Sequence, residues 1–139
     1  MKDSWGWIGI DPAEIISVNA FGNLLIRDVA GRVWRLCPEE LACTIVAENE
    51  DELTVLLRDP EFLTDWEMNN LVEMARVKLG PLPQGRRYSL KIPGVLGGKY
   101  EEHNLATLLL DEMISFSGDL SRQIKDAPHG TQVKIKFVE

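Results

Sequence analysis

The first third of the chain shows the two-residue alternation of apolar and polar positions that is typical of β-strands. A short apolar run over residues 15–20 predicts one strand. Leu24 and Ile26 alternate with polar or edge positions, and the turn sequence DVAG at 28–31 leads to a second apolar segment at 34–36. Two alternating segments joined by such a turn predict a β-hairpin.

Four further stretches predict strands. Pro38 ends the second strand of the hairpin, because its ring nitrogen cannot donate a hydrogen bond to a neighbouring strand. A short strand is then predicted over 44–47. Others are predicted over 88–92, 104–110 and 133–137, where apolar residues alternate with polar ones or form a buried run.

The middle of the chain changes to the helical spacing of apolar residues, at intervals of three and four. Asn49 followed by Glu52 has the arrangement of a helix N-cap, and Asp59 followed by Pro60 marks the start of a second helix. A third helix is predicted over 68–79 from a single apolar stripe. These helices lie between two groups of strands.

Glycines accompany the predicted helix ends. Gly80, followed by Pro81, ends the third helix. A last apolar stripe over 113–124, slightly broken by Gly118, predicts another helix. Hairpins around segregated helices indicate an α+β fold, with a mainly antiparallel sheet and two to four helices packed on it.

A length of 139 residues predicts one domain, over residues 1–139. With 45% hydrophobic and 27% charged residues, the composition is typical of a globular protein. No run approaches the roughly 20 apolar residues that span a bilayer. The N-terminal sequence lacks the apolar region of a secretory signal. Cys37 and Cys43 are too few for a disulfide framework. We therefore expect reduced thiols, a cytoplasmic location and no contact with a membrane.

The net charge of −7 narrows the classes of partner. Direct nucleic-acid binding is not expected, because it requires a basic surface that displaces counterions. Residues 39–67 contain ten acidic residues and one arginine. A one-sided acidic face attracts a basic partner, although a solvated face that only aids solubility is an equally consistent interpretation. The candidate partner-binding residues are Glu48, Glu50, Asp51, Glu52, Asp59, Glu61 and Asp65, with Trp5 and Trp7 as aromatic anchors unless they belong to the core.

The glycine-rich stretch KIPGVLGGKYEEHNL at 91–105 does not match a phosphate-binding loop. A P-loop requires a glycine, four residues, Gly-Lys and then Ser or Thr. In this chain Pro93 stands at the glycine position and Tyr100 at the hydroxyl position. Pro93 has no amide to donate, and Tyr100 is too bulky. The glycines instead predict a tight turn with positive φ after the strand that ends at Ile92.

No other pattern predicts catalysis or a cofactor. Glu101, Glu102 and His103 are consecutive and cannot all point at one metal ion. The serines of the last predicted helix lack a nucleophile elbow, and Cys37 is expected in a packed position. His129 is expected in a turn. We expect no enzyme activity, no cofactor and no metal, although the sequence leaves open a pair of carboxylates acting on a glycoside.

Two stretches resemble a known family. They are FGNLLIRDVAGRVWRLCPEEL at 21–41 and IPGVLGGKYEEHNLATLLLDEMISFSGDLSRQIK at 92–125. Together they resemble the family named for the C-terminal domain of the immunity protein that protects bacteria from a type VI secreted DNase. The resemblance spans 18–125. Larger members of that family carry an additional N-terminal domain, so this chain resembles a single-domain version.

The resemblance implies a small cytoplasmic α+β protein that binds and silences a toxin encoded beside it. It assigns no catalytic residue. A nuclease toxin would present a basic cleft, which an acidic protein can fill by charge complementarity. The oligomeric state is left open. Two alternatives remain: a binding or regulatory module with an unrelated protein partner, and a small enzyme with perturbed titrating groups in a defined pocket.

Overall fold

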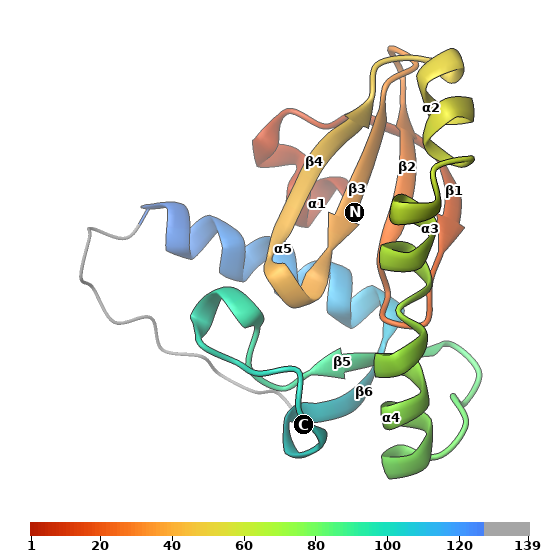
Figure 1. Ribbon diagram of the computed structural model, residues 1–139. Helices are drawn as coiled ribbons and strands as arrows, with labels where there is room; N and C mark the ends of the chain where they lie inside the picture. The colour runs from red at the N-terminus through yellow and green to blue at the C-terminus, as the bar shows by residue number, and fades with distance from the viewer. Residues whose placement is uncertain (127–139) are drawn as a thin grey trace.

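The computed structural model describes residues 1–126 and shows the α+β fold that the sequence predicts (Figure 1). Two antiparallel sheets are present in these residues, one of four strands in the order β1-β2-β3-β4 and one that pairs β5 with β6. The predicted strand at 133–137 and His129 lie outside the described residues. The strands are β1 Pro12–Val18, β2 Leu24–Asp28, β3 Val33–Cys37, β4 Ala42–Ala47, β5 Arg86–Leu90 and β6 Leu105–Leu109.

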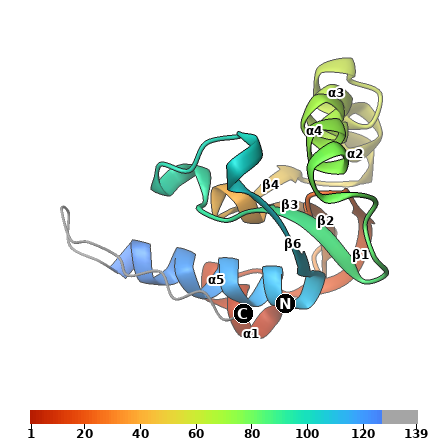
Figure 2. The same ribbon diagram turned by 90° about the horizontal axis from the view of Figure 1, so that it is seen from below.

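Helices cover both faces of the four-stranded sheet (Figures 1 and 2). Helices α1 and α5 pack on one face, and α2 and α3 pack on the other. Helix α4 packs against the two-stranded sheet. The helices are α1 Lys2–Trp5, α2 Glu50–Leu56, α3 Pro60–Glu67, α4 Asn69–Leu79 and α5 Leu110–Asp126, and short 3-10 turns occupy Gly6–Ile8, Pro38–Glu40, Gly94–Leu96 and Glu102–Asn104.

The predicted helix caps are confirmed. The Asn49 side chain accepts a hydrogen bond from the Glu52 amide at 2.9 Å, and the Asp59 side chain accepts one from the Glu61 amide at 3.0 Å. Each carboxyl or amide oxygen satisfies one of the amides that a helix start leaves without a partner. Gly80 ends α4 with a φ of 84°. Local capping chemistry therefore sets where the central helices begin and end.

The central strands β2 and β3 of the four-stranded sheet are largely buried on both faces, which corrects one prediction. Leu24 and Ile26 belong to the same buried cluster as Ile114 of α5, as the alternation predicts. Leu25 does not lie at an edge or among polar groups; it is 1% exposed and belongs to the buried cluster that includes Leu53 of α2. A second layer of helices makes the intervening position apolar as well.

Gly118, which slightly breaks the predicted apolar stripe, lies inside α5 and allows another segment to approach the helix. The helix continues through this residue to Asp126. A β-carbon at Gly118 would lie 2.5 Å from the carbonyl oxygen of Ser4. The indole nitrogen of Trp7 donates to the Gly118 carbonyl at 3.3 Å. Glycine at this position therefore lets the N-terminal helix cross α5 closely, which local sequence does not reveal.

The predicted tight turn in the 91–105 stretch is confirmed, although β5 ends at Leu90 rather than Ile92. Gly97 has a φ of 92°, and a β-carbon at Gly98 would collide with the Ile92 carbonyl oxygen at 1.7 Å. Asn104 closes the loop, since its side chain accepts from the Ile92 amide at 2.9 Å and donates to the Ile92 carbonyl at 3.0 Å. The glycines therefore allow the backbone to make this turn: Gly97 adopts the positive φ and Gly98 leaves room for the Ile92 carbonyl.

Asp28 organises the turn between β2 and β3. Its carboxylate accepts hydrogen bonds from the amides of Ala30 and Arg32, both at 2.9 Å, and from the Trp34 indole at 2.9 Å. The residue is 3% exposed. Burial alone would raise its pKa, but the hydrogen bonds from Trp34, Arg32 and Ala30 outweigh burial and hold the pKa below its usual value.

We predict that Asp28→Asn lowers the free energy of unfolding at neutral pH by about 2 kcal/mol, because one carboxylate acceptor becomes a donor facing buried donors. The folded pKa is lower than the unfolded one, so this contribution is complete above about pH 4 and is lost as the pH falls through the folded pKa. Urea unfolding of both proteins should show the difference shrinking toward about pH 3. A difference that does not change with pH would contradict this role of the carboxylate.

Candidate functional site

The predicted acidic residues gather on α2, α3 and the segments that lead into these helices. All seven are exposed. Helices α2, α3 and α4 follow one another along one side of the molecule (Figure 1). Asp51 and Glu61 lie in first helical turns, where the positive end of the helix stabilises a negative charge. We call the surface formed by Glu48, Glu50, Asp51, Glu52, Asp59, Glu61 and Asp65 the acidic face.

Some of these acidic side chains form ion pairs or hydrogen bonds within the chain. Glu50 pairs with Arg27 at 2.5 Å, and Asp65 pairs with Arg35 at 2.5 Å. Glu52 accepts a hydrogen bond from the Glu48 amide at 3.0 Å. These carboxylates contribute to the attachment or capping of the helices, so their charge is not wholly available to a partner.

Asp51 and Glu61 form no ion pair with any residue of 1–126. Beside Asp51 lies a hollow of about 370 Å³ with an apolar floor that includes Val55, whose exposed fraction is 71%. Acidic groups at the rim of an apolar floor can receive a long basic side chain, which buries its stem and keeps its charged end at the rim. The acidic face therefore offers both charge and apolar contact.

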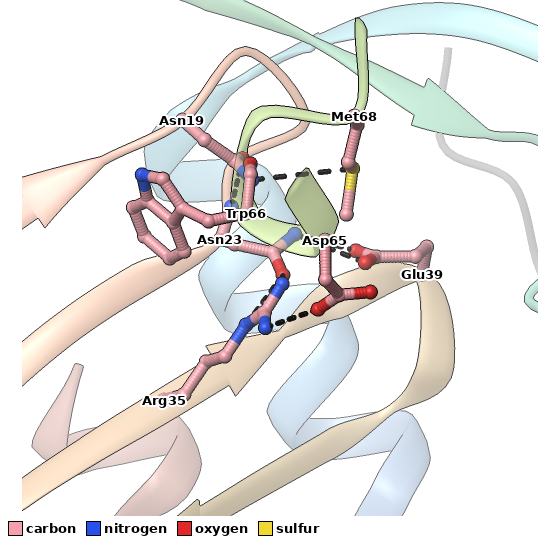
Figure 3. A network of polar contacts seen from close by, with 7 residues as sticks. All are labelled: Asn19, Asn23, Arg35, Glu39, Asp65, Trp66 and Met68. Carbon is pink, nitrogen blue, oxygen red and sulfur yellow. Dashed lines mark hydrogen bonds and ion pairs between the residues drawn. The ribbon is translucent and has the colours of Figure 1, made fainter. Parts of the chain in front are cut away.

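A polar network connects the four-stranded sheet to α3 beneath the acidic face (Figure 3). Arg35 of β3 donates through Nη1 to Asp65 at 2.5 Å, and through Nε and Nη2 to the side-chain oxygen of Asn23 at 3.3 and 3.1 Å. The side-chain nitrogen of Asn23 then donates to both carboxylate oxygens of Glu39, at 3.0 and 2.8 Å. One guanidinium thus orients a chain of buried groups.

Aromatic rings complete the surroundings of Arg35. Its guanidinium carbon lies 5.6 Å from the ring centroid of Phe62 and 5.3 Å from that of Trp66, distances at which a cation is attracted to a ring. The two half-buried rings stack on one another, and Asn19 donates to the Trp66 carbonyl at 2.9 Å. Helix α3 is therefore attached to the sheet by polar as well as apolar contacts.

Glu39 is the buried acid of the network. It lies in the Pro38–Glu40 turn and is 5% exposed. Burial raises the pKa of its carboxyl, while the hydrogen bond from Asn23, its own backbone and the charge of Arg35 act in the opposite direction. Residues 1–126 give this carboxylate no ion pair. It is a buried acid whose charge is only partly compensated.

A cavity of about 650 Å³ lies beside the network, between β3, the Pro38–Glu40 turn and the junction of α3 with α4. Met68, at the junction, lines it, and Leu41 follows the turn. Among residues 1–126, these are the two non-glycine residues with positive φ, 50° each. Such backbone is uncommon and costs free energy. The polar part of the wall includes Arg35, Glu39, Glu40, Thr64, Asp65 and Tyr100.

Sequence reasoning did not find this network or cavity. The residues come from positions 19 to 100, so no local spacing links them. The one local signal is Arg35 itself, a charged residue within the otherwise apolar strand VWRLC. A charge at such a position requires a partner if it is buried.

The two predicted tryptophan anchors have different positions. Trp5 is 1% exposed and belongs to the core with Leu24 and Ile114, so it is not available as a surface anchor. Trp7 is half-buried and stacks on Trp5, and the Lys125 ammonium lies 5.0 Å from the centroid of its ring. Both belong to the cluster that contains Ile114 of α5. Helices α1 and α5 lie on the face of the sheet opposite α2 and α3 (Figure 2).

Other candidate chemistry does not assemble in the described part of the chain. Burial raises the pKa of Cys37 and of Cys43 to about 12, so both are unreactive thiols at neutral pH. His103 is exposed and lies 3.5 Å from Glu101. Residues 1–126 contain no cluster of three or more side chains suited to a metal ion. Nor do they contain a helix with the length and apolar character needed to cross a membrane.

Comparison with known families gives a match. The family model described as "T6SS immunity protein Tdi1, C-terminal" matches residues 47–121, which is more than half of the chain. This stretch contains the whole acidic face, but neither Trp5 nor Trp7. It also contains most of the second stretch on which the resemblance rests, whereas 21–41 lies before it. A comparison with curated proteins found no match.

We predict that Arg35→Lys lowers the free energy of unfolding by about 2 kcal/mol, because an ammonium cannot donate to Asn23 and Asp65 together in the forked geometry of a guanidinium. The control is Arg76→Lys on exposed α4, whose pairing with Glu73 should be worth less than about 0.5 kcal/mol. Chemical denaturation followed by tryptophan fluorescence measures both. Equal effects of the two substitutions would contradict a central role for Arg35.

Proposed function

The chain belongs to the family of the C-terminal region of the type VI secretion immunity protein Tdi1, and we propose that it neutralises a cognate secreted toxin by direct contact through the acidic face. The family match over residues 47–121 is the observation that carries this proposal. Immunity families act on toxins, so the match supports toxin neutralisation in general. The contact surface and the class of toxin are our own inference.

Charge supports the acidic face as the contact surface. The whole acidic face lies within the matched stretch and its seven residues are exposed. Helices α2 and α3, which carry most of them, lie along one side of the molecule (Figure 1). Complementary charge speeds association and excludes wrong partners more than it raises affinity. An apolar hollow beside Asp51 adds area that a partner can bury. The face has the mixed character of a protein interface.

A nuclease is the class of toxin that this surface fits best. An enzyme that acts on nucleic acid needs basic residues to bind the phosphate backbone. A protein with a net charge of −7 and a one-sided acidic face can cover such a cleft. We propose inhibition by occlusion of that cleft. The alternative, a regulatory module with an unrelated partner, predicts no protection against any toxin.

Co-expression tests the function. The toxin gene encoded nearby is placed under an inducible promoter in a sensitive bacterium, with and without this chain. We expect growth to stop when the toxin is expressed alone and to recover with the chain, and we expect the two purified proteins to form a complex. A harmless neighbouring gene product, or toxicity that persists, would favour the regulatory module.

Charge reversal tests the contact surface. We predict that Asp51→Lys with Glu61→Lys weakens toxin binding at least tenfold, mainly through slower association, and that the loss shrinks at high salt. Both residues are exposed, lack an ion pair within 1–126 and lie in first helical turns. Surface plasmon resonance at two salt concentrations measures the effect.

The matched control is Asp111→Lys with Glu112→Lys, which changes the net charge equally. These residues are also exposed and lie in the first turn of α5, on the opposite side of the sheet. Both double variants therefore lose similar interactions with a helix end. If the control weakens binding as much as the test variant, the acidic face is not the contact surface, although toxin neutralisation itself would stand.

A further inference from the structure

We infer that the cavity beside Glu39 receives an arginine side chain of the toxin, whose guanidinium completes the coordination of the buried Glu39 carboxylate. This inference rests on the proposed function, which it deepens by naming an anchor. Three features of the molecule support it: the charge of the cavity, the hydrogen bonding of Glu39 and the residues of the wall.

The cavity carries more negative than positive charge. Among the lining residues that the structure describes, Glu39, Glu40 and Asp65 are acidic and Arg35 is the one cation. The Arg35 guanidinium is already directed at Asn23 and Asp65 and lies near two aromatic rings. It is therefore not free to bind an incoming anion. A cation is the ligand that the remaining charge attracts.

Glu39 has unused capacity to accept hydrogen bonds. Within residues 1–126, its two oxygens accept from one side-chain donor, the Asn23 amide nitrogen, and from its own backbone, whereas a carboxylate can accept about four hydrogen bonds. The Asn23 amide cannot rotate to offer more, because its oxygen accepts from Arg35. A buried carboxylate without an ion pair is costly, so a donor that enters the cavity gains more from Glu39 than from an exposed acid.

The rest of the wall suits a guanidinium on an aliphatic stem. Asn69 and Asn70, at the start of α4, and Thr64 add side-chain oxygens to those of the acids. A guanidinium has five N–H groups and can use several acceptors at once, whereas an ammonium has three. Leu71 and the neutral thiol of Cys37 provide apolar contact for the stem. The number of acceptors favours arginine over lysine.

The cavity is continuous with the proposed interface. Thr64 and Asp65 line it, and both also line a shallow hollow on α3 with Glu61. A basic partner on the acidic face can therefore reach the cavity along α3, past Glu61 and Asp65. Buried anchors of this kind commonly carry a large share of the binding energy of an interface, and arginine is frequent among them.

The first test uses a free probe and needs no toxin. L-argininamide is titrated into the 15N-labelled protein, with citrulline amide as the control, which has a similar shape and the same α-amino group but an uncharged urea in place of the guanidinium. We expect saturable amide shifts at Glu39 and across Thr64–Leu71 with argininamide only, and their loss in Glu39→Gln. No saturable shift, or equal shifts in Glu39→Gln, would overturn the inference whether or not the chain neutralises a toxin.

The second test uses the toxin complex. Glu39→Gln and the cavity-blocking Asn70→Trp should each raise the Kd for the toxin at least tenfold, mainly through faster dissociation. The control is Glu73→Trp, an exposed position on α4 outside the cavity wall. If Glu39→Gln perturbs folding, Asn70→Trp still tests the cavity, because Asn70 is exposed and its substitution should not disturb the core. If argininamide binds but toxin affinity is unchanged, the cavity holds a free cationic ligand and the assignment to a toxin side chain is wrong.

Discussion

The guanidinium of Arg35 joins the four-stranded sheet to the helices on one of its faces. It donates to Asn23 on the sheet side and to Asp65 on α3, and it lies between the sheet and the stacked rings of Phe62 and Trp66. A nearly buried charge requires such partners, because leaving it unpaired costs several kcal/mol. The position of α3, and with it the acidic face and the cavity beside Glu39, depends on this contact.

The residues of the acidic face fall into two groups, those in ion pairs within the chain and those without one in the described residues. Glu50 and Asp65 pair with arginines of the sheet, whereas Asp51 and Glu61 have no ion pair within the described residues. The first pair helps to hold the helices in place, and the second leaves charge for a partner. A net charge of −7 therefore does not translate directly into binding surface. Substitutions at the two kinds of position should have different effects on stability and on binding.

Much of the local structure could be predicted from the sequence. Asn49, Asp59 and Gly80 act within one helical turn, so their neighbours along the chain are sufficient to identify them. The β2–β3 hairpin follows from alternation and a four-residue turn. The clustering of acids between 39 and 67 also led to the acidic face. These features depend on spacings of a few residues, which a sequence displays directly.

Features that depend on distant contacts could not be predicted. Leu25 is buried because a second layer of helices covers its face of the sheet, and Gly118 is required by the approach of Ser4. Trp5 is an aromatic residue near a terminus and is therefore predicted as a surface anchor, but the contact between α1 and α5 places it in the core. The network around Arg35 brings together residues 12 to 30 positions apart. Only the fold determines which of these groups meet.

The most direct measurement of the central claim is hydrogen–deuterium exchange of the chain alone and in complex with its toxin. Contact through the acidic face predicts slower exchange in the amides of 48–71 and little change in α1 and α5. The largest decrease in exchange on complex formation should occur in α3 and at the α3–α4 junction, where the acidic face and the cavity meet. Protection confined to α1 and α5 would contradict the account and place the interface on the opposite side of the sheet.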